Sequence, residues 1–141
     1  MKATLDHIGI AVEGLSDALA FYRDALGLDV SPVYDVPTEQ VRAVFVPVGD
    51  ASLELLEATS STSVIARFVA RHGPGLHHIT LTVADLDQAL ANLAARGVTL
   101  IDRAPRAGAN GSRVAFVHPS SAGGVLLELK QNGPGPGAGA A

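Results

Sequence analysis

Residues 76–83, LHHITLTV, repeat a pattern that the chain has already used at residues 6–12, DHIGIAV. A shift of 71 positions places His7 on His78, and it places the run ALA at 18–20 on the same run at 89–91. In both copies the apolar residues first alternate, which predicts a strand, and then follow a helical period. Because an internal repeat defines the architecture of a chain, two similar halves are predicted.

Each half is predicted to run strand, helix and three strands, which makes the fold class α+β with two tandem βαβββ modules. The modules are expected at about 4–58 and 75–130, joined by a helix at about 61–72, within one domain over residues 1–131. The remaining stretch 132–141 is rich in Gly, Pro and Ala and is expected to be a flexible tail. The strands are expected at 4–12, 28–36, 41–48, 52–57, 77–83, 98–101, 112–117 and 125–130, with a loop at 105–111.

The bare sheet faces of the two modules are expected to form one open, curved sheet around a ligand site. In the first strand, Ile8, Ile10 and Val12 would face the core. His7, Gly9 and Ala11 would face the concave side. Ser16 or Asp17 is expected to cap the helix that follows.

Composition excludes several classes of protein. The 141 residues carry a net charge of −4 and no cysteine, so neither a basic nucleic-acid surface nor a disulfide framework is expected. There is no apolar run long enough to span a membrane and no signal-like N-terminus. These features are typical of a cytoplasmic domain.

Four residues take matching places in the two modules: His7 and His78 on the first strands, and Glu54 and Glu128 on the last. A single strand histidine is more often structural, and a single strand glutamate often faces solvent. However, an acid inside an apolar strand is costly unless it is paired or bound to a metal, and here this occurs twice. Two imidazoles and two carboxylates favour a divalent transition metal such as Co, Mn, Ni or Zn.

The other polar residues receive less weight. His77 has the wrong strand parity for the concave side and is interpreted as structural. Glu57 is interpreted as solvent-facing or strand-terminal. His118, before Pro119, is interpreted mainly as a turn residue. Arg106, Arg113 and Lys130 would suit an anionic substrate, but isolated cations are usually solvated.

Longer motifs give the sequence a resemblance that covers nearly all of residues 5–130. It resembles the vicinal-oxygen-chelate superfamily (the glyoxalase-type fold) and, more narrowly, the methylmalonyl-CoA epimerases. The most specific motifs are GLHH at 75–78, PRAGANGSRVAF at 105–116, HP at 118–119 and GGVLLEL at 123–129.

The resemblance implies that His7, Glu54, His78 and Glu128 hold one divalent metal ion, Co²⁺ before Mn²⁺, Ni²⁺ or Zn²⁺. It implies interconversion of (R)- and (S)-methylmalonyl-CoA by metal-assisted proton abstraction and reprotonation through an enolate. The substrate would then be an acyl-CoA, and the protein would form a homodimer. Arg113 and His118 are weak candidates for substrate binding.

One departure from the family concerns the second proton-transfer group. Some relatives carry a glutamate where this sequence has Ala43. Glu128 and Glu54 are therefore the predicted catalytic pair, with Glu39 as the alternative to Glu54. Two other functions stay open on the same fold: a glyoxalase I-type lactoylglutathione lyase, and a metal-free protein that binds a small molecule and confers resistance.

Overall fold

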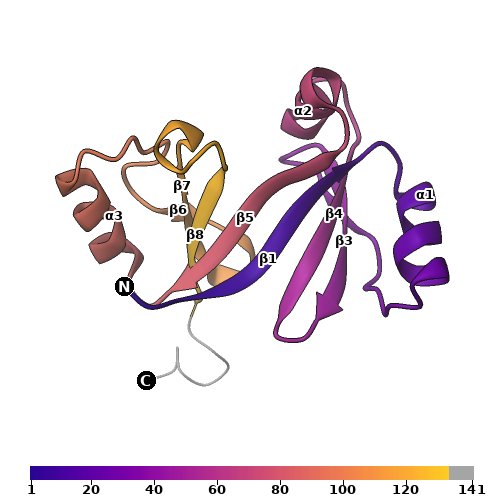
Figure 1. Ribbon diagram of the computed structural model, residues 1–141, viewed down its shortest axis with the longest axis horizontal. Coiled ribbons are helices and arrows are strands. Elements are labelled where there is room, and N and C mark those ends of the chain that lie inside the picture. The colour runs from indigo at the N-terminus through magenta and orange to yellow at the C-terminus, as the bar shows by residue number, and fades with distance from the viewer. Residues whose placement is uncertain (134–141) are drawn as a thin grey trace. The chain divides into compact units, whose positions relative to one another are not determined.

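The computed structural model describes residues 1–133, which form two compact units. The first unit is His7–His78. The second contains Met1–Asp6 and the residues from Ile79 onward. The elements follow one another as β1-α1-β2-β3-β4, then α2, then β5-α3-β6-β7-β8 (Figure 1). This order confirms the α+β class and the two tandem βαβββ modules.

Strands β1 (Ala3–Val12) and β5 (Gly75–Val83) each contribute residues to both units. In the first unit the strand order is β2-β3-β4-β1. Strand β3 (Val41–Val48) pairs antiparallel with β4 (Ala51–Ala58), and β4 pairs parallel with β1. A two-residue turn at Gly49 and Asp50 joins β3 to β4.

Strand β2 is shorter than predicted, because only Tyr34–Val36 of the expected 28–36 pairs with β3. Pro32 lies within the lost part, and proline has no N–H to donate to a neighbouring strand. The next four residues, 37–40, form the turn before β3.

Helix α1 (Leu15–Leu19) continues as a π-helical turn, Ala20–Ala25, and the chain then turns at Gly27 with φ of 72°. The predicted cap by Ser16 or Asp17 is wrong. The N-cap is Gly14, and the carboxylate of Glu57 on β4 accepts a hydrogen bond from the Leu15 N–H at 2.7 Å. Glu57 is therefore not solvent-facing. Its side chain is 16% exposed and also pairs with Arg42 at 2.6 Å.

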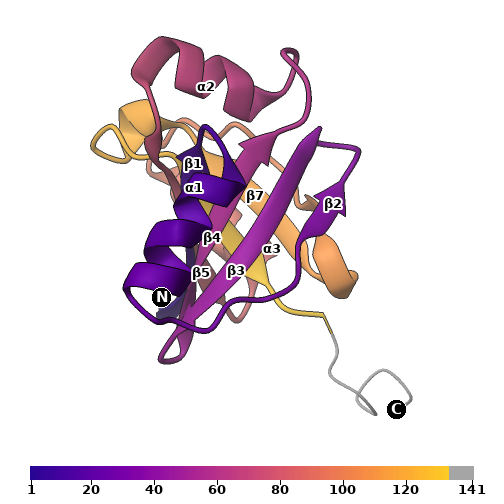
Figure 2. The same cartoon turned by 90° about the vertical axis from the view of Figure 1, so that its right-hand side faces the viewer.

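Two apolar clusters cover the two faces of the first unit's sheet. One face packs against α1, through the buried residues Leu15, Val44, Val46 and Leu55. The other packs against α2 (Val64–His72), which begins at the Ser63 cap and lies beside the ends of β3 and β4 (Figure 2). There Ile65 contacts a cluster of Ala11, Val41, Ala43 and Leu56.

This second cluster corrects the interpretation of the first strand. Ala11 was expected to line an open concave face, but it is fully buried beneath α2. Alternation along β1 still holds, since His7, Gly9 and Ala11 share one face. Helix α2 covers the Ala11 end of this face of β1, and His7 lies at the other end.

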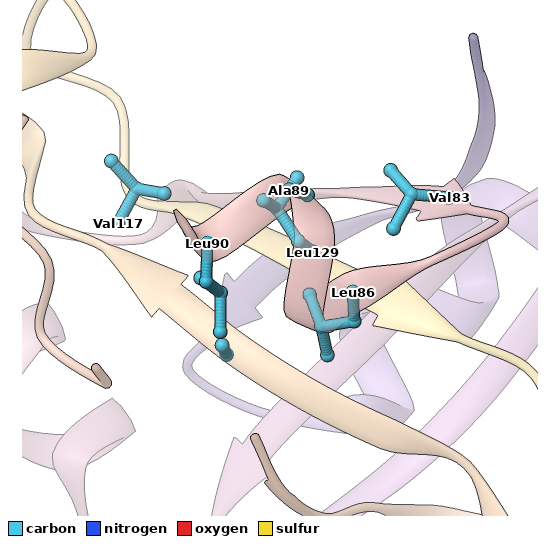
Figure 3. Packing of buried hydrophobic residues seen from close by; sticks show 7 residues of the cluster. Val83, Leu86, Ala89, Leu90, Val117 and Leu129 are labelled. Atoms are coloured by element: carbon cyan, nitrogen blue, oxygen red, sulfur yellow. The ribbon is translucent and has the colours of Figure 1, made fainter. Parts of the chain in front are cut away.

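In the second unit the strand order is β5-β8-β7-β6. Strand β8 (Leu127–Gln131) is parallel to β5 and antiparallel to β7 (Arg113–Val117). Helix α3 (Leu86–Ala95), whose N-cap is Asp85, packs on this sheet. Figure 3 shows the buried side chains that join them: Val83, Leu86, Ala89, Leu90, Val117 and Leu129.

Two local predictions in this unit are wrong. The expected strand at 98–101 is reduced to one bridge, between Leu100 and Val117. The expected loop at 105–111 instead contains the short edge strand β6 (Arg106–Ala107) and a 3-10 turn, Ala109–Gly111. A second 3-10 turn, Pro119–Ser121, precedes β8. Edge strands this short depend on pairing with a neighbour, which a local pattern does not encode.

Among the described residues, no helix is both long and apolar enough to cross a membrane. Most of the predicted C-terminal tail, residues 134–141, lies outside the described part of the chain.

Candidate metal centre

Three side chains of the first unit converge on a small volume: His7 from β1, Glu54 from β4 and His78 from β5. The Nε2 atoms of the two histidines are 3.2 Å apart. The Glu54 Oε1 atom lies 3.5 Å from the His7 Nε2 and 3.7 Å from the His78 Nε2. Three of the four residues that the sequence proposed as ligands thus lie close together, and their role as metal ligands stays a prediction.

Strand register explains the convergence. In the parallel β1–β4 pair, Gly9 is opposite Glu54. His7 is two positions earlier on β1, so its side chain leaves the sheet on the same side. His78 fills the space over Gly9: a Cβ atom built on Gly9 would overlap the ring atoms Cε1 and Nδ1 of His78. Because Gly9 has no side chain, the ring of His78 can occupy this space.

Burial keeps the central imidazole neutral. His78 is only 9% exposed, and burial lowers the pKa of His78 to about 3, with further lowering by the neighbouring His77 and His7. Burial also lowers the pKa of His77. Because a metal binds the neutral form of imidazole, His78 is ready to act as a ligand across the neutral pH range.

The donor set fits a divalent transition-metal ion. Bonds of about 2.0–2.2 Å to one ion would hold neighbouring ligand atoms about 3.0–3.5 Å apart. The three observed separations, 3.2, 3.5 and 3.7 Å, lie close to that range. Two imidazole nitrogens and one carboxylate oxygen suit Zn, Co, Mn or Ni better than Mg or Ca. The residues present therefore fit the predicted metal.

An aromatic side chain borders this triad. The Phe45 ring stands edge-on to His7 at 6.3 Å between ring centroids, and Tyr34 packs on Phe45 at 6.2 Å. Since Phe45 is opposite Glu54 in the β3–β4 pair, it lies on the same face of the sheet. These rings form an apolar wall next to the polar centre.

The fourth predicted ligand, Glu128, belongs to the second unit. It is half-buried on β8, and its Oε1 atom accepts a hydrogen bond from the Thr80 hydroxyl at 2.5 Å. By the shift of 71, Thr80 is the counterpart of Gly9. The roles of Glu128 as a ligand and as a catalytic group stay predictions.

The weak candidates for substrate binding have local partners. Arg113 makes a two-point ion pair with Asp87 of α3, at 2.9 and 3.1 Å. This pairing lowers the pKa of Asp87. The His118 Nδ1 atom accepts a hydrogen bond from the Ser120 N–H at 3.0 Å and caps a 3-10 turn, in agreement with its interpretation as a turn residue.

Arg106 and Lys130 also have partners close by. Arg106 lies over the Phe116 ring at 5.2 Å and 3.4 Å from Asp102. Lys130 pairs with Asp6 at 3.4 Å. Glu39 lies in the exposed turn before β3.

Two residues near the centre, Gly9 and His77, make contacts with His78 that the sequence did not predict. Gly9 gives His78 its space, and His77 contacts the His78 ring directly, Nδ1 to Nδ1 at 2.9 Å. His77 is not part of the group formed by His7, Glu54 and His78, as strand parity predicted. The signal that could have drawn attention to it is the adjacent pair itself, since a flexible ring can reach back to its neighbour.

Comparison with known proteins places this geometry in context. Residues 6–116 match the model of the glyoxalase/bleomycin resistance protein/dioxygenase superfamily. The mitochondrial methylmalonyl-CoA epimerase of Bos taurus is 37% identical over 90% of this chain and 73% of its own length.

Two solved structures are similar throughout. The methylmalonyl-CoA epimerase of Mycobacterium tuberculosis superposes with a TM-score of 0.82 at 36% identity, over 92% of this chain and 88% of that one. A methylmalonyl-CoA epimerase in complex with methylmalonyl-CoA and NH4+ gives a TM-score of 0.82 at 34% identity, over 94% and 96%.

Proposed function

Because this chain belongs to the methylmalonyl-CoA epimerase family of the glyoxalase/bleomycin resistance protein/dioxygenase superfamily, we propose that it interconverts (R)- and (S)-methylmalonyl-CoA. The observation that carries the proposal is the convergence of His7, Glu54 and His78 in one unit of a chain with these relatives. The substrate is then an acyl-CoA thioester, and the enzyme is an isomerase.

The reaction sets clear chemical demands. The hydrogen that moves is bound to the carbon between a thioester carbonyl and a carboxylate. Inverting that carbon requires a base on one face and an acid on the other. A divalent metal ion, when bound, would supply electrostatic stabilisation to oxygen atoms next to that carbon.

The residues of this chain divide these tasks. His7 and His78 are neutral nitrogen donors that would hold the ion, together with Glu54. Glu54 and Glu128 are the two carboxylates proposed to take and return the proton. The hydroxyl of Thr80 donates to the Glu128 Oε1 atom and so orients this carboxylate. The Phe45 ring lies beside His7 and adds an apolar neighbour to the triad.

The relatives support the epimerase function and not the lactoylglutathione lyase considered from sequence. Metal dependence, the choice of Co²⁺ and assembly as a homodimer are finer parts of the proposal. The His-Glu-His donor set supports the first of these.

Hydrogen exchange provides the direct test. The protein loaded with Co²⁺ is incubated with (S)-methylmalonyl-CoA in D₂O, and the thioester is analysed by NMR and mass spectrometry. We expect one deuterium at the α carbon and formation of the (R) isomer. The matched control is Glu128→Gln, in which the Thr80 contact has an amide oxygen in place of a carboxylate oxygen. We expect this variant to keep its fold and lose at least about 100-fold in rate, as for removal of an acid–base group.

Two results would overturn parts of this assignment. Absence of deuterium at the α carbon in the loaded wild-type protein would exclude the epimerase function. Full activity of Glu128→Gln would exclude Glu128 as a proton-transfer group.

A further inference from the structure

The ring of His78 makes polar contacts through both of its nitrogens. Its Nε2 atom faces His7 and Glu54, and its Nδ1 atom lies 2.9 Å from the Nδ1 of His77. Only the first of these contacts involves residues of the proposed metal site. The second joins His78 to a neighbour that is not in the donor set, so a role for His77 needs a separate argument.

The contact between two ring nitrogens restricts where the protons are. A hydrogen bond needs one N–H and one lone pair, so only one of the two Nδ1 atoms carries hydrogen. When the Nε2 lone pair of neutral His78 is used to bind a metal, the hydrogen of that ring must be on Nδ1. His78 then donates, and His77 must accept through an unprotonated Nδ1. This is the arrangement in which the second ring nitrogen of a metal ligand is held by a neighbouring acceptor.

The surroundings of His77 hold its ring in place for this task. The Phe68 ring of α2 packs edge-on against His77 at 5.0 Å between ring centroids, with an interplanar angle of 88°. The rings of His77 and His78 are themselves perpendicular, at 90° and 5.1 Å. Gly9 also borders the His78 ring, and a Cβ built there would overlap the Cε1 and Nδ1 atoms of the imidazole. The ring of His78 thus has both Gly9 and His77 as close neighbours.

We propose that His77 is a positioning residue that holds His78 as the Nδ1–H tautomer, so that its Nε2 atom is presented to the metal. The inference rests on the proposed function only in taking His78 as a metal ligand. Phe68 supports it by fixing the ring of His77. The sequence pair His77-His78 therefore contains one ligand and the residue that orients it.

The test compares three substitutions. His77→Phe keeps an aromatic ring against Phe68 but removes the acceptor. His77→Asn places an amide oxygen near the position of Nδ1 and restores an acceptor. His72→Phe is the matched control, because exposed His72 also packs on Phe68, at 5.0 Å, and makes no described contact with His78. Circular dichroism and thermal unfolding verify that each variant is folded.

The first measurement is the dissociation constant for Zn²⁺, determined by competition with a chromophoric chelator and without any substrate. We expect His77→Phe to weaken Zn²⁺ binding by about 10- to 100-fold, the usual effect of removing a partner of a metal-bound histidine. His77→Asn should recover most of this loss, and His72→Phe should bind as the wild type does. Wild-type affinity in His77→Phe would overturn the proposal, and so would the absence of Zn²⁺ binding in the wild-type protein.

The second measurement is ¹⁵N NMR of the Zn²⁺-loaded protein, which reports the tautomer of each ring. We expect hydrogen on the Nδ1 of His78, an unprotonated Nδ1 on His77, and a coupling across the hydrogen bond between the two nuclei. Hydrogen on the His77 Nδ1 would overturn the proposal. If the tautomers are as expected but no deuterium is incorporated, the epimerase function is excluded and the proposed role of His77 still stands.

Discussion

Glycine at position 9 is the residue on which the triad depends most directly without being a ligand. Its φ is not in the left-handed region, so the requirement is one of space and not of backbone conformation. Any side chain there would compete with the His78 ring for the same volume. A larger residue at position 9 would force the His78 ring to move away from its present place beside His7 and Glu54.

We therefore expect Gly9→Ala to displace the ring of His78 and to weaken metal binding by at least about tenfold. Overpacking should also lower the free energy of unfolding by about 1–3 kcal/mol. Calorimetric titration with Zn²⁺ and urea denaturation measure the two effects. The control is Gly14→Ala, where the new Cβ would meet only the Glu57 Oε2 at 3.8 Å. Equal metal affinity in the two variants would contradict the prediction.

Ala43, where the sequence resemblance led us to expect a glutamate, lies in an apolar part of the first unit. It shares a sheet face with Phe45 and is 2% exposed, packed with Ala11 and Ile65. A carboxylate at this place would be buried among apolar groups at considerable cost. Alanine has no titratable side chain, so Glu54 is the residue that we propose for the second proton transfer.

In both modules the N–H of the first helical residue donates to a side chain of the last strand, although the accepting residues differ in type. The Glu57 carboxylate accepts from the Leu15 N–H at 2.7 Å, and the Gln131 side-chain oxygen accepts from the Leu86 N–H at 2.8 Å. In each case a residue of the last strand caps the helix that follows the first strand. The contact joins elements far apart in sequence, since 42 and 45 residues separate the partners.

Substitutions of Glu57 and of Arg42 together distinguish the cap from the ion pair. We expect Glu57→Ala to lower the free energy of unfolding by about 1–2 kcal/mol, because the Leu15 N–H loses its acceptor. Glu57→Gln should cost much less, since glutamine already performs this task at position 131.

Urea denaturation measures both variants, with Arg42→Ala as the control. Arg42 is about half-exposed, so removing its pair with Glu57 should have only a small effect. If Glu57→Ala is as stable as the wild type, the cap does not contribute as described.

Assembly of the triad draws on residues 7, 54 and 78, and so on three strands of the first unit. Ligand binding to the folded state alone stabilises a protein by mass action. A metal at this place would therefore tie β1, β4 and β5 together and oppose their separation on unfolding.

Metal addition should consequently raise the Tm. We expect Zn²⁺ at 100 times its dissociation constant to add about 2.7 kcal/mol to the free energy of unfolding relative to protein in EDTA. Differential scanning calorimetry measures the change. His7→Ala should remove most of this difference while remaining folded, and an equal metal effect in that variant would place the ion elsewhere.

Much of this architecture was accessible from the sequence because its signals are local. The repeat around His7 and His78, the alternation of apolar residues and the helical stripes predicted two βαβββ modules. They also predicted that Glu54 meets the two histidines, since matched strand positions return to the same face. Family motifs added the expected activity.

Tertiary structure decided what depends on contacts between distant elements. The burial of Ala11 under α2, the capping of α1 by Glu57 and the space above Gly9 all arise from packing across the unit. The same holds for His77, whose parity excluded it as a ligand but whose ring nitrogen reaches His78. Strand parity states which way a side chain leaves the sheet, whereas its partners depend on the folded positions of residues that the local pattern does not relate.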